Sequence, residues 1–183
     1  MRVSLRTLPA LLRTHPLAVL LAATASAAVG CGAAPAATPP ITPGTDAAPR
    51  EVNVIARDFS FEPGIVDLVP GETVMLHVVN AGLVVHEAVV GDMRVQDAWE
   101  AAEGAAANPP PGPTPLVSVP PDVAGLRVVA ESGQRVDTRW TVPASAADGD
   151  PWFVGCHVPG HWQLGMVVPV RFVGRDGLPL ASS

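Results

Sequence analysis

The chain has 183 residues, of which 48% are hydrophobic, and it carries a formal net charge of −6. Its basic side chains are all arginines, eleven in number, against seventeen acidic residues. Such an acidic chain lacks the basic surface that binding to nucleic-acid phosphates requires, so the composition excludes that function.

The first thirty residues have the pattern of a secretory signal peptide. Arg2, Arg6 and Arg13 precede an apolar stretch over 17–29. This stretch is shorter than the roughly 20 residues that a membrane-spanning helix needs, as is usual for a signal peptide. No Arg-Arg pair precedes it, which argues against the twin-arginine route. We therefore predict a signal peptide over 1–30 and a protein that works outside the cytoplasm.

The next residues indicate a lipid anchor. Ala28-Val29-Gly30-Cys31 resembles the lipobox of bacterial lipoproteins, although Ala28 stands where Leu is usual. The alternative is an ordinary signal peptide cleaved nearby, with Cys31 incidental. Residues 31–50 are rich in Ala, Pro and Thr, which suits a tether better than a core. We predict lipidation of Cys31 and attachment to a membrane, in the periplasm or on the outer face of the cell membrane.

One folded domain is expected after this tether. Residues 51–175 are enough for a single hydrophobic core, and 176–183 would form a short tail. Beyond Gly30 there are eight arginines and seventeen acidic residues, so this part carries a net charge of −9 with histidine neutral. A basic or neutral protein partner would suit that surface.

Alternating apolar and polar residues predict that this domain is built mainly of strands. At its start Val52, Val54 and Ala56 share one face, and Phe59 and Phe61 continue the same period of two. Turn signals such as Pro70-Gly71 separate the runs. Short strands at this spacing predict an all-β antiparallel sandwich. The predicted strands cover 51–61, 65–69, 72–80, 83–90, 126–130, 136–142, 152–156 and 166–173.

An insertion over 92–121 interrupts this rhythm. Residues 96–107 are rich in Ala and Glu and predict a short helix, whereas the proline cluster over 108–115 cannot remain helical. We expect the insertion to lie on the outside of the sheets.

The clearest chemical signal is a motif with the spacing Cys-x4-His-x4-Met, formed by Cys156, His161 and Met166. It brings a thiolate, an imidazole and a thioether into one loop, and this mixture suits copper better than other common metals. Pro159-Gly160 and Gly165 supply turn residues where the loop must bend.

A second imidazole would complete a His2Cys site with a weak axial Met, the arrangement of electron-transfer copper. His86 and His77 compete for this role. In the strand over 72–80, Val74, Leu76 and Val78 are expected to face inward, so His77 between them points outward. His86 follows a turn at the start of a strand, and we predict it as the missing ligand.

Other uses of Cys156 fit less well. A structural zinc site needs four Cys or His ligands, and the thioether of Met is not such a ligand. A c-type haem needs Cys-x-x-Cys-His, which is absent. Nucleophilic Cys-His catalysis leaves Met166 without a role. A buried Cys acting as a small hydrophobe leaves both His161 and Met166 unexplained.

These residues resemble the cupredoxins, the family of type 1 blue copper proteins. The resemblance covers about 51–173 and rests on Asn80 with His86, on the Cys156-x4-His161-x4-Met166 loop, and on Phe59-Ser60-Phe61-Glu62-Pro63. The loop spacing is most like that of auracyanin and rusticyanin. The resemblance implies a Greek-key sandwich in which His86, Cys156, His161 and Met166 bind one copper ion.

Three positions differ from related patterns or remain open. Cupredoxins often have Asn or Ser after the first ligand His, and here Glu87 stands there. An ionised Glu87 would favour Cu(II), unless it faces solvent. Multicopper oxidases have a His on each side of the Cys, but here Gly155 replaces the first and no His-x-His pair occurs. Their oxygen-reducing cluster therefore cannot form, and His157 is expected on the alternate face of the strand.

The function predicted from these observations is that of an electron carrier, not of an enzyme. A monomer would shuttle single electrons between a redox donor and an acceptor, with Trp162 and Pro159 as possible docking residues beside His161. Trp162 could instead merely cover the site. The alternatives are a copper-binding module for storage, delivery or resistance, and a domain that supplies electrons within a fixed complex. The sequence lacks the Met-rich or His-rich tracts expected of delivery proteins.

Overall fold

The computed structural model describes residues 39–107 and 117–180. Cys31 and the predicted signal peptide lie outside these residues, as do residues 31–38 of the predicted tether and the proline cluster of the insertion. In the part of the chain described, no helix has both the length and the apolar character needed to cross a membrane.

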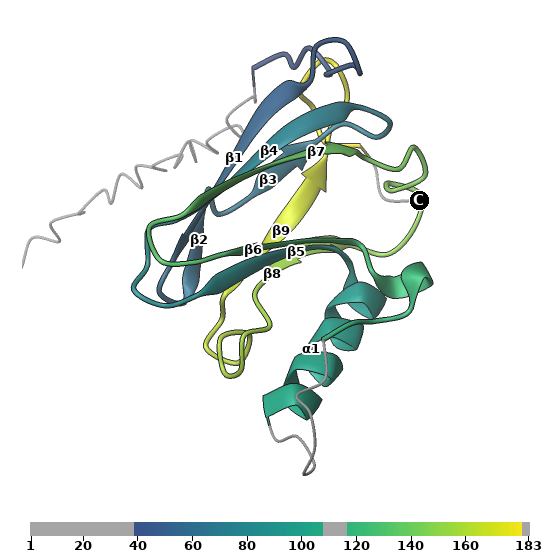
Figure 1. Cartoon of the computed structure of the whole chain (residues 1–183). Helices are drawn as coiled ribbons and strands as arrows, with labels where there is room; N and C mark the ends of the chain where they lie inside the picture. The colour runs from purple at the N-terminus through teal and green to yellow at the C-terminus, as the bar shows by residue number, and fades with distance from the viewer. Residues whose placement is uncertain (1–38, 108–116, 181–183) are drawn as a thin grey trace, which may run out of the picture. The chain divides into compact units, whose positions relative to one another are not determined.

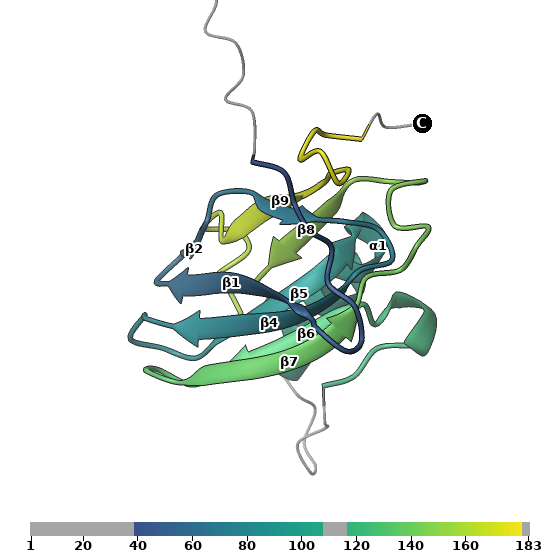
Figure 2. The ribbon, with the colours of Figure 1, turned by 90° about the horizontal axis from the view of Figure 1, so that it is seen from above.

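The described residues form two β-sheets, one α-helix and the short 3-10 helix η1, Pro121–Val123 (Figure 1). One sheet has the strand order β2-β1-β4-β7 and the other has the order β3-β9-β8-β5-β6. Figure 2 shows β1, β4 and β7 side by side as neighbours in the first sheet. The strands are β1 Arg50–Arg57, β2 Ser60–Glu62, β3 Val66–Leu68, β4 Thr73–Asn80, β5 His86–Asp92, β6 Leu126–Ala130, β7 Arg135–Thr141, β8 Trp152–Gly155 and β9 Val167–Phe172.

The predicted β-sandwich with a helical insertion is confirmed. Most neighbouring strands are antiparallel, but β1 pairs with β4 in parallel and β3 pairs with β9 in parallel. Both sheets are therefore mixed, a detail that alternation along a single strand cannot reveal because it does not specify which strands become neighbours.

The core lies between the inner faces of the two sheets. From the first sheet it receives Val54 of β1 and Val74, Leu76 and Val78 of β4, so the expected inward phase of β4 is confirmed. The second sheet contributes Val128, Val154 and Val168, among others. This apolar interior fixes the strand register, because a slip by one residue would turn every buried side chain outward.

The predicted strand over 83–90 begins later, at His86. Asn80 holds the preceding residues as a loop: its Nδ2 donates to the carbonyl oxygens of Val84 (2.7 Å) and Ala130 (2.9 Å), and its Oδ1 accepts from the N–H of Gly82 (2.9 Å). The amide thus gives the 81–85 loop the hydrogen bonds that a strand would have supplied. As a result His86 is the first residue of β5.

The prediction of one continuous strand over 51–61 is wrong. The chain leaves β1 after Arg57, turns at Asp58 and Phe59, and returns as β2. Phe59 has a φ of 65°, in the left-handed region that bulky residues rarely occupy. The buried phase changes at this turn, because Val52, Val54 and Ala56 are buried on β1 whereas the next buried residue, Phe61 on β2, lies five positions after Ala56.

The insertion forms helix α1, Met93–Ala107, which starts three residues before the predicted position. Asp92 caps it, since its Oδ1 accepts the N–H of Val95 at 3.0 Å. The helix packs against β5 and β8, outside the core between the sheets, as expected (Figure 1). Trp99 is buried there and donates from Nε1 to the carbonyl of Ala124 at 2.9 Å.

Candidate metal centre

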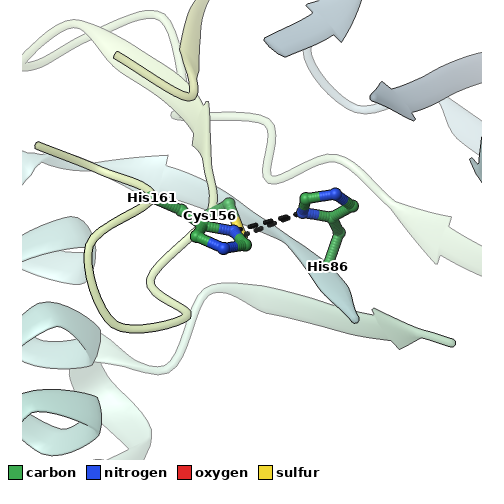
Figure 3. A group of neighbouring side chains, drawn as sticks. All are labelled: His86, Cys156 and His161. Atoms are coloured by element: carbon green, nitrogen blue, oxygen red, sulfur yellow. Dashed lines mark hydrogen bonds between the residues drawn. The ribbon is translucent and has the colours of Figure 1, made fainter. Parts of the chain in front are cut away.

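Three predicted ligands meet at one end of the sandwich, where the β1–β2 turn, the 81–85 loop and the β8–β9 loop come together. Figure 3 shows the side chains of His86, Cys156 and His161 pointing toward one another. Their ligand atoms all lie within 4.8 Å of one another, and all three residues are buried. Among the described residues no other group of three His, Cys, Asp or Glu side chains gathers in this way.

The separations between these atoms fit one shared ion. The Nδ1 atoms of His86 and His161 are 3.2 Å apart, and they lie 3.9 Å and 3.3 Å from the Cys156 sulfur. Ligands bound at about 2.0–2.3 Å around one ion have similar mutual distances. A thiolate with two imidazoles and a nearby thioether is the donor set that suits copper.

Cys156 is the first residue after β8, and main-chain contacts fix it at the start of the ligand loop. Its N–H donates to the Met166 carbonyl at 3.1 Å, and its sulfur accepts from the N–H of Glu87 at 3.5 Å. Burial, above all, raises the pKa of the thiol to about 11. Without a cation the sulfur therefore keeps its proton at neutral pH, and metal binding must displace that proton.

His161 lies in the turn over 159–165. The predicted turn residues adopt the left-handed conformation, with φ values of 92° at Gly160 and 89° at Gly165. The His161 N–H donates to the Val158 carbonyl at 2.9 Å. Burial lowers the pKa of His161, and the neighbouring His86 lowers it further. Both effects favour the neutral imidazole, which is the form that binds a metal.

Met166 closes the ligand loop. Its N–H donates to the His161 carbonyl at 3.1 Å, and its carbonyl accepts from Cys156, so the backbone of this residue is tied to both other ligands in the loop. The side chain is fully buried and belongs to the same apolar core as Cys156.

His86 is fully buried and is the histidine that reaches the loop. Its Nδ1 faces Cys156 and His161, while its Nε2 lies 3.2 Å from Asp58 Oδ1. The same Asp58 oxygen accepts the N–H of Leu83 at 2.9 Å. That backbone hydrogen bond, and then the hydrogen bond from His86, lower the pKa of Asp58.

His77 is held elsewhere, on the side of β4 that faces away from the core. Its Nε2 pairs with Glu51 of β1, and its Nδ1 lies 2.7 Å from Asp137 of β7. These two hydrogen bonds, from Glu51 first and then from Asp137, raise the pKa of His77. Both ring nitrogens of His77 thus have hydrogen-bond partners on the first sheet, and His77 does not belong to the cluster of His86, Cys156 and His161.

Glu87 does not face solvent. Its buried carboxylate accepts the backbone N–H of His157 at 3.0 Å through Oε1 and pairs with Arg127 at 2.6 Å through Oε2. Arg127 in turn pairs with Glu103 of α1 at 2.7 Å, and its guanidinium lies 4.5 Å from the Trp99 ring centre. The residue after the first histidine therefore connects β5, β6, the ligand loop and the inserted helix.

His157 extends this network into α1. Its Nδ1 lies 2.8 Å from Glu100, its Nε2 lies 2.8 Å from the Gln96 side-chain oxygen, and its ring stacks on Trp162 with centres 4.9 Å apart. Sequence reasoning missed Gln96 and Glu100 as neighbours of the ligand loop. Their spacing of four residues on one helical face was the available signal, but it does not specify which segment that face contacts.

The surface beside His161 is apolar. Trp162 is half-buried because it stacks on His157, whereas Pro159 is exposed. The ring of Phe59 meets the His161 imidazole edge-on, with centres 5.2 Å apart. The converging loops also expose the apolar side chains of Phe59, Leu83, Val84 and Leu164, and sequence reasoning assigned no role to Leu83 and Val84.

Comparisons with known sequences identify no relative: no protein-family model matches the chain, and no curated protein sequence matches it significantly. Solved structures do resemble it. Auracyanin B is 22% identical over 75% of this chain and 96% of its own, with a TM-score of 0.53. Auracyanin A, a blue copper protein from Chloroflexus aurantiacus, is 21% identical over 69% of this chain and 100% of its own, with a TM-score of 0.51.

A third structure, the dithionite-reduced auracyanin of Roseiflexus castenholzii, is 17% identical and covers 68% of this chain and 97% of its own, with a TM-score of 0.50. At these identities the likeness concerns the fold. Together with the two mixed sheets described above, it shows that the chain has the cupredoxin fold.

Proposed function

We propose that this protein is an exported type 1 copper protein that binds one copper ion through His86, Cys156, His161 and Met166 and passes single electrons between redox partners. The observation that carries the proposal is the convergence of two imidazoles and one thiol, all buried, with their ligand atoms within 4.8 Å. The same loop supplies a buried thioether.

When bound at such a site, copper supplies a one-electron Cu(I)/Cu(II) couple. The chain's own contribution is to hold its ligands in place and to exclude water. The Glu87 N–H donates to the Cys156 sulfur, the Cys156 N–H donates to the Met166 carbonyl, and Asp58 holds His86. Because the protein fixes these side chains before an electron arrives, little rearrangement has to accompany its transfer.

Burial of the ligands also supports a carrier over the alternative of a copper-delivery module. A module that hands over its ion needs an acceptor to reach the ligands, yet His86, Cys156 and Met166 are fully buried and His161 is nearly so. No substrate conversion follows from this arrangement, so we propose a carrier and not an enzyme.

The surface beside His161 is the proposed docking surface. Phe59, Leu83, Val84 and Leu164 are exposed there, and Pro159 lies on the same loop as His161. Trp162 is half-buried, because one face of its ring stacks on His157, so it contributes only part of its ring to this surface. A small apolar surface of this kind suits the brief contacts that redox proteins make. We propose separate donor and acceptor proteins that use it in turn with a monomeric carrier.

Lipidation of Cys31 and tethering through the Ala/Pro-rich residues that follow it complete the proposal. Support comes from the sequence alone, in the short apolar stretch over 17–29 and the Ala/Pro-rich segment that follows it. Mass spectrometry of the mature N-terminus tests this part independently of the copper site. An N-terminal acylated Cys31 is expected, and an unmodified N-terminus at another residue would contradict the anchor.

The experiment that tests the copper site is a visible spectrum of the copper-loaded domain combined with voltammetry. We expect an intense thiolate-to-Cu(II) charge-transfer band and a reversible one-electron wave. The band should vanish in Cys156→Ser and change in His86→Gln. His77→Gln is the matched control, since both ring nitrogens of His77 already have partners. A colourless Cu(II) form of the wild-type protein would refute the proposal.

A further inference from the structure

We propose that Asp58 is a positioning residue of the metal centre, which holds the His86 imidazole in place and, through its negative charge, lowers the reduction potential of the bound copper. This inference rests on the proposed function, because it assumes that His86 is a ligand.

The first step is the orientation of the His86 ring. Its Nδ1 faces the Cys156 sulfur at 3.9 Å and the His161 Nδ1 at 3.2 Å, whereas its Nε2 lies 3.2 Å from Asp58 Oδ1. One nitrogen therefore faces the cluster and the opposite one faces a carboxylate. A carboxylate in this place fixes the proton on Nε2, leaves Nδ1 free to bind, and makes the imidazole a stronger donor.

Asp58 is itself held in position. The oxygen that contacts His86 also accepts the N–H of Leu83 at 2.9 Å. The next residue, Phe59, adopts a φ of 65°, which is strained for a bulky side chain, and its ring meets His161 edge-on at 5.2 Å. The β1–β2 turn therefore contacts both imidazoles of the cluster, one through a carboxylate and the other through an aromatic ring.

Gly82 encloses the contact between Asp58 and His86. A Cβ atom added at Gly82 would lie 2.5 Å from Asp58 Oδ1 and 2.7 Å from His86 Nε2, so only glycine allows the 81–85 loop to pass this close. The Gly82 carbonyl accepts from Ser132 Oγ at 2.7 Å, which ties the loop down. The backbone thus shields the hydrogen bond on one side, although the Asp58 side chain keeps 35% of its surface exposed.

The negative charge of Asp58 should lower the reduction potential of the bound copper. Oxidation adds one positive charge to the centre, so a nearby carboxylate stabilises Cu(II) relative to Cu(I). A more basic imidazole acts in the same direction. Removing the charge should therefore raise the reduction potential.

Asp58→Asn is the decisive variant. The amide oxygen can still accept from Leu83 and His86, but the charge is lost. We expect the ratio of Cu(II) to Cu(I) affinity to fall about tenfold, which corresponds to a potential higher by about 59 mV. In the reduced protein, the His86 Nε2–H should exchange slowly with solvent by NMR in the wild type and in Asp58→Asn, and faster in Asp58→Ala.

Glu62→Gln is the matched control. Glu62 is the last residue of β2, which returns from the same turn; it is 53% exposed and pairs with Arg57 at 2.9 Å, but it contacts no imidazole. Its loss removes the same charge and should leave the potential nearly unchanged. If the wild-type protein shows the copper–thiolate band, but Asp58→Asn and Glu62→Gln have equal reduction potentials, only the role of Asp58 is overturned. Absence of that band from the wild type would instead overturn the proposed function.

Gly82→Ala provides a second route to the same question without changing Asp58. The added methyl group should displace Asp58 from His86, raise the potential in the same direction and accelerate the Nε2–H exchange. A wild-type exchange rate and potential in folded Gly82→Ala would overturn the role assigned to this contact.

Discussion

Glu87 Oε1 accepts the backbone N–H of His157 at 3.0 Å, and this hydrogen bond joins the strand of one predicted ligand to the loop of the others. The second oxygen of the same carboxylate pairs with Arg127 at 2.6 Å. Because the Glu87 side chain is almost fully buried, its charge is stable in this place only while Arg127 balances it. The ion pair is therefore part of the support of the metal centre.

Arg127→Met should accordingly destabilise the metal-free domain by about 3 kcal/mol, toward the lower end for a broken buried pair because Arg127 is 26% exposed. Urea unfolding measures the change. Arg94→Met is the control, since Arg94 is 71% exposed and pairs with Asp92 at the surface; it should cost less than about 0.5 kcal/mol. Adding Glu87→Gln to Arg127→Met should recover part of the loss. Equal costs for the two arginine variants would contradict the structural role of the pair.

Substitution by alanine should lower the stability of the domain at Gly155 and raise it at Gly104. A Cβ atom at Gly155 would lie 2.5 Å from the Gln96 side-chain oxygen and 2.6 Å from the Trp162 ring, so Gly155→Ala should push α1 away from the ligand loop and cost about 1–3 kcal/mol. Gly104 lies in α1 with nothing within 4 Å of its Cβ position, and alanine there should stabilise the helix by about 0.5–1 kcal/mol.

Thermal unfolding measures both glycine variants, and the visible spectrum of the copper form separates local from global effects. We expect Gly155→Ala to shift the thiolate band because the substitution lies next to Cys156, and Gly104→Ala to leave it unchanged. A Gly155→Ala protein as stable as the wild type would show that the helix does not brace the loop.

His77 bridges Glu51 and Asp137, and this His77 bridge should make the free energy of unfolding depend on pH. Its carboxylate partners, Glu51 first and then Asp137, raise the pKa of the folded imidazole, while burial and then the charge of Arg135 oppose them. The contribution is fully present below the unfolded pKa of about 6.5 and is lost as pH rises through the higher folded pKa. The stability advantage of the wild type over His77→Gln should therefore shrink as pH increases, measured by urea unfolding from acid to mildly alkaline pH.

High salt provides the control for this bridge, because Glu51 and Asp137 are largely exposed and their attraction is screened. In about 1 M salt the difference between the two proteins should become smaller at low pH. A difference that grows with pH, or that is independent of it, would contradict the bridge.

Sequence reasoning could predict the features that depend on residues close together in the sequence. Cys156, His161 and Met166 lie on one loop, and the phase of Val74 and Val78 excluded His77 from the core between the sheets, so these features could be predicted from neighbouring residues in the sequence. The hydrogen-bond network around the ligands could not be predicted in this way. Asp58 contacts His86 across 28 residues of sequence, and Gln96 contacts His157 across 61.

Such contacts depend on which loops the sheets bring to the same end, and alternation does not encode that. Phe59 is the clearest case. Its place in the period of two indicated a strand, yet the Asp58–Phe59 turn lets the chain fold back as β2 and so places two side chains beside the imidazoles.

Met166→Leu tests the thioether without disturbing the fold. Leucine has a similar volume, so the fully buried site should tolerate it at a cost below about 1.5 kcal/mol. Leucine cannot donate to a metal, and loss of a weak donor disfavours Cu(II) more than Cu(I), so voltammetry should show a higher reduction potential. Met75→Leu is the control, since Met75 lies on β4 outside the ligand loop. If Met166→Leu shifted the potential no more than Met75→Leu, Met166 could not be the axial ligand, and the buried cluster of His86, Cys156 and His161 would have to hold the ion alone.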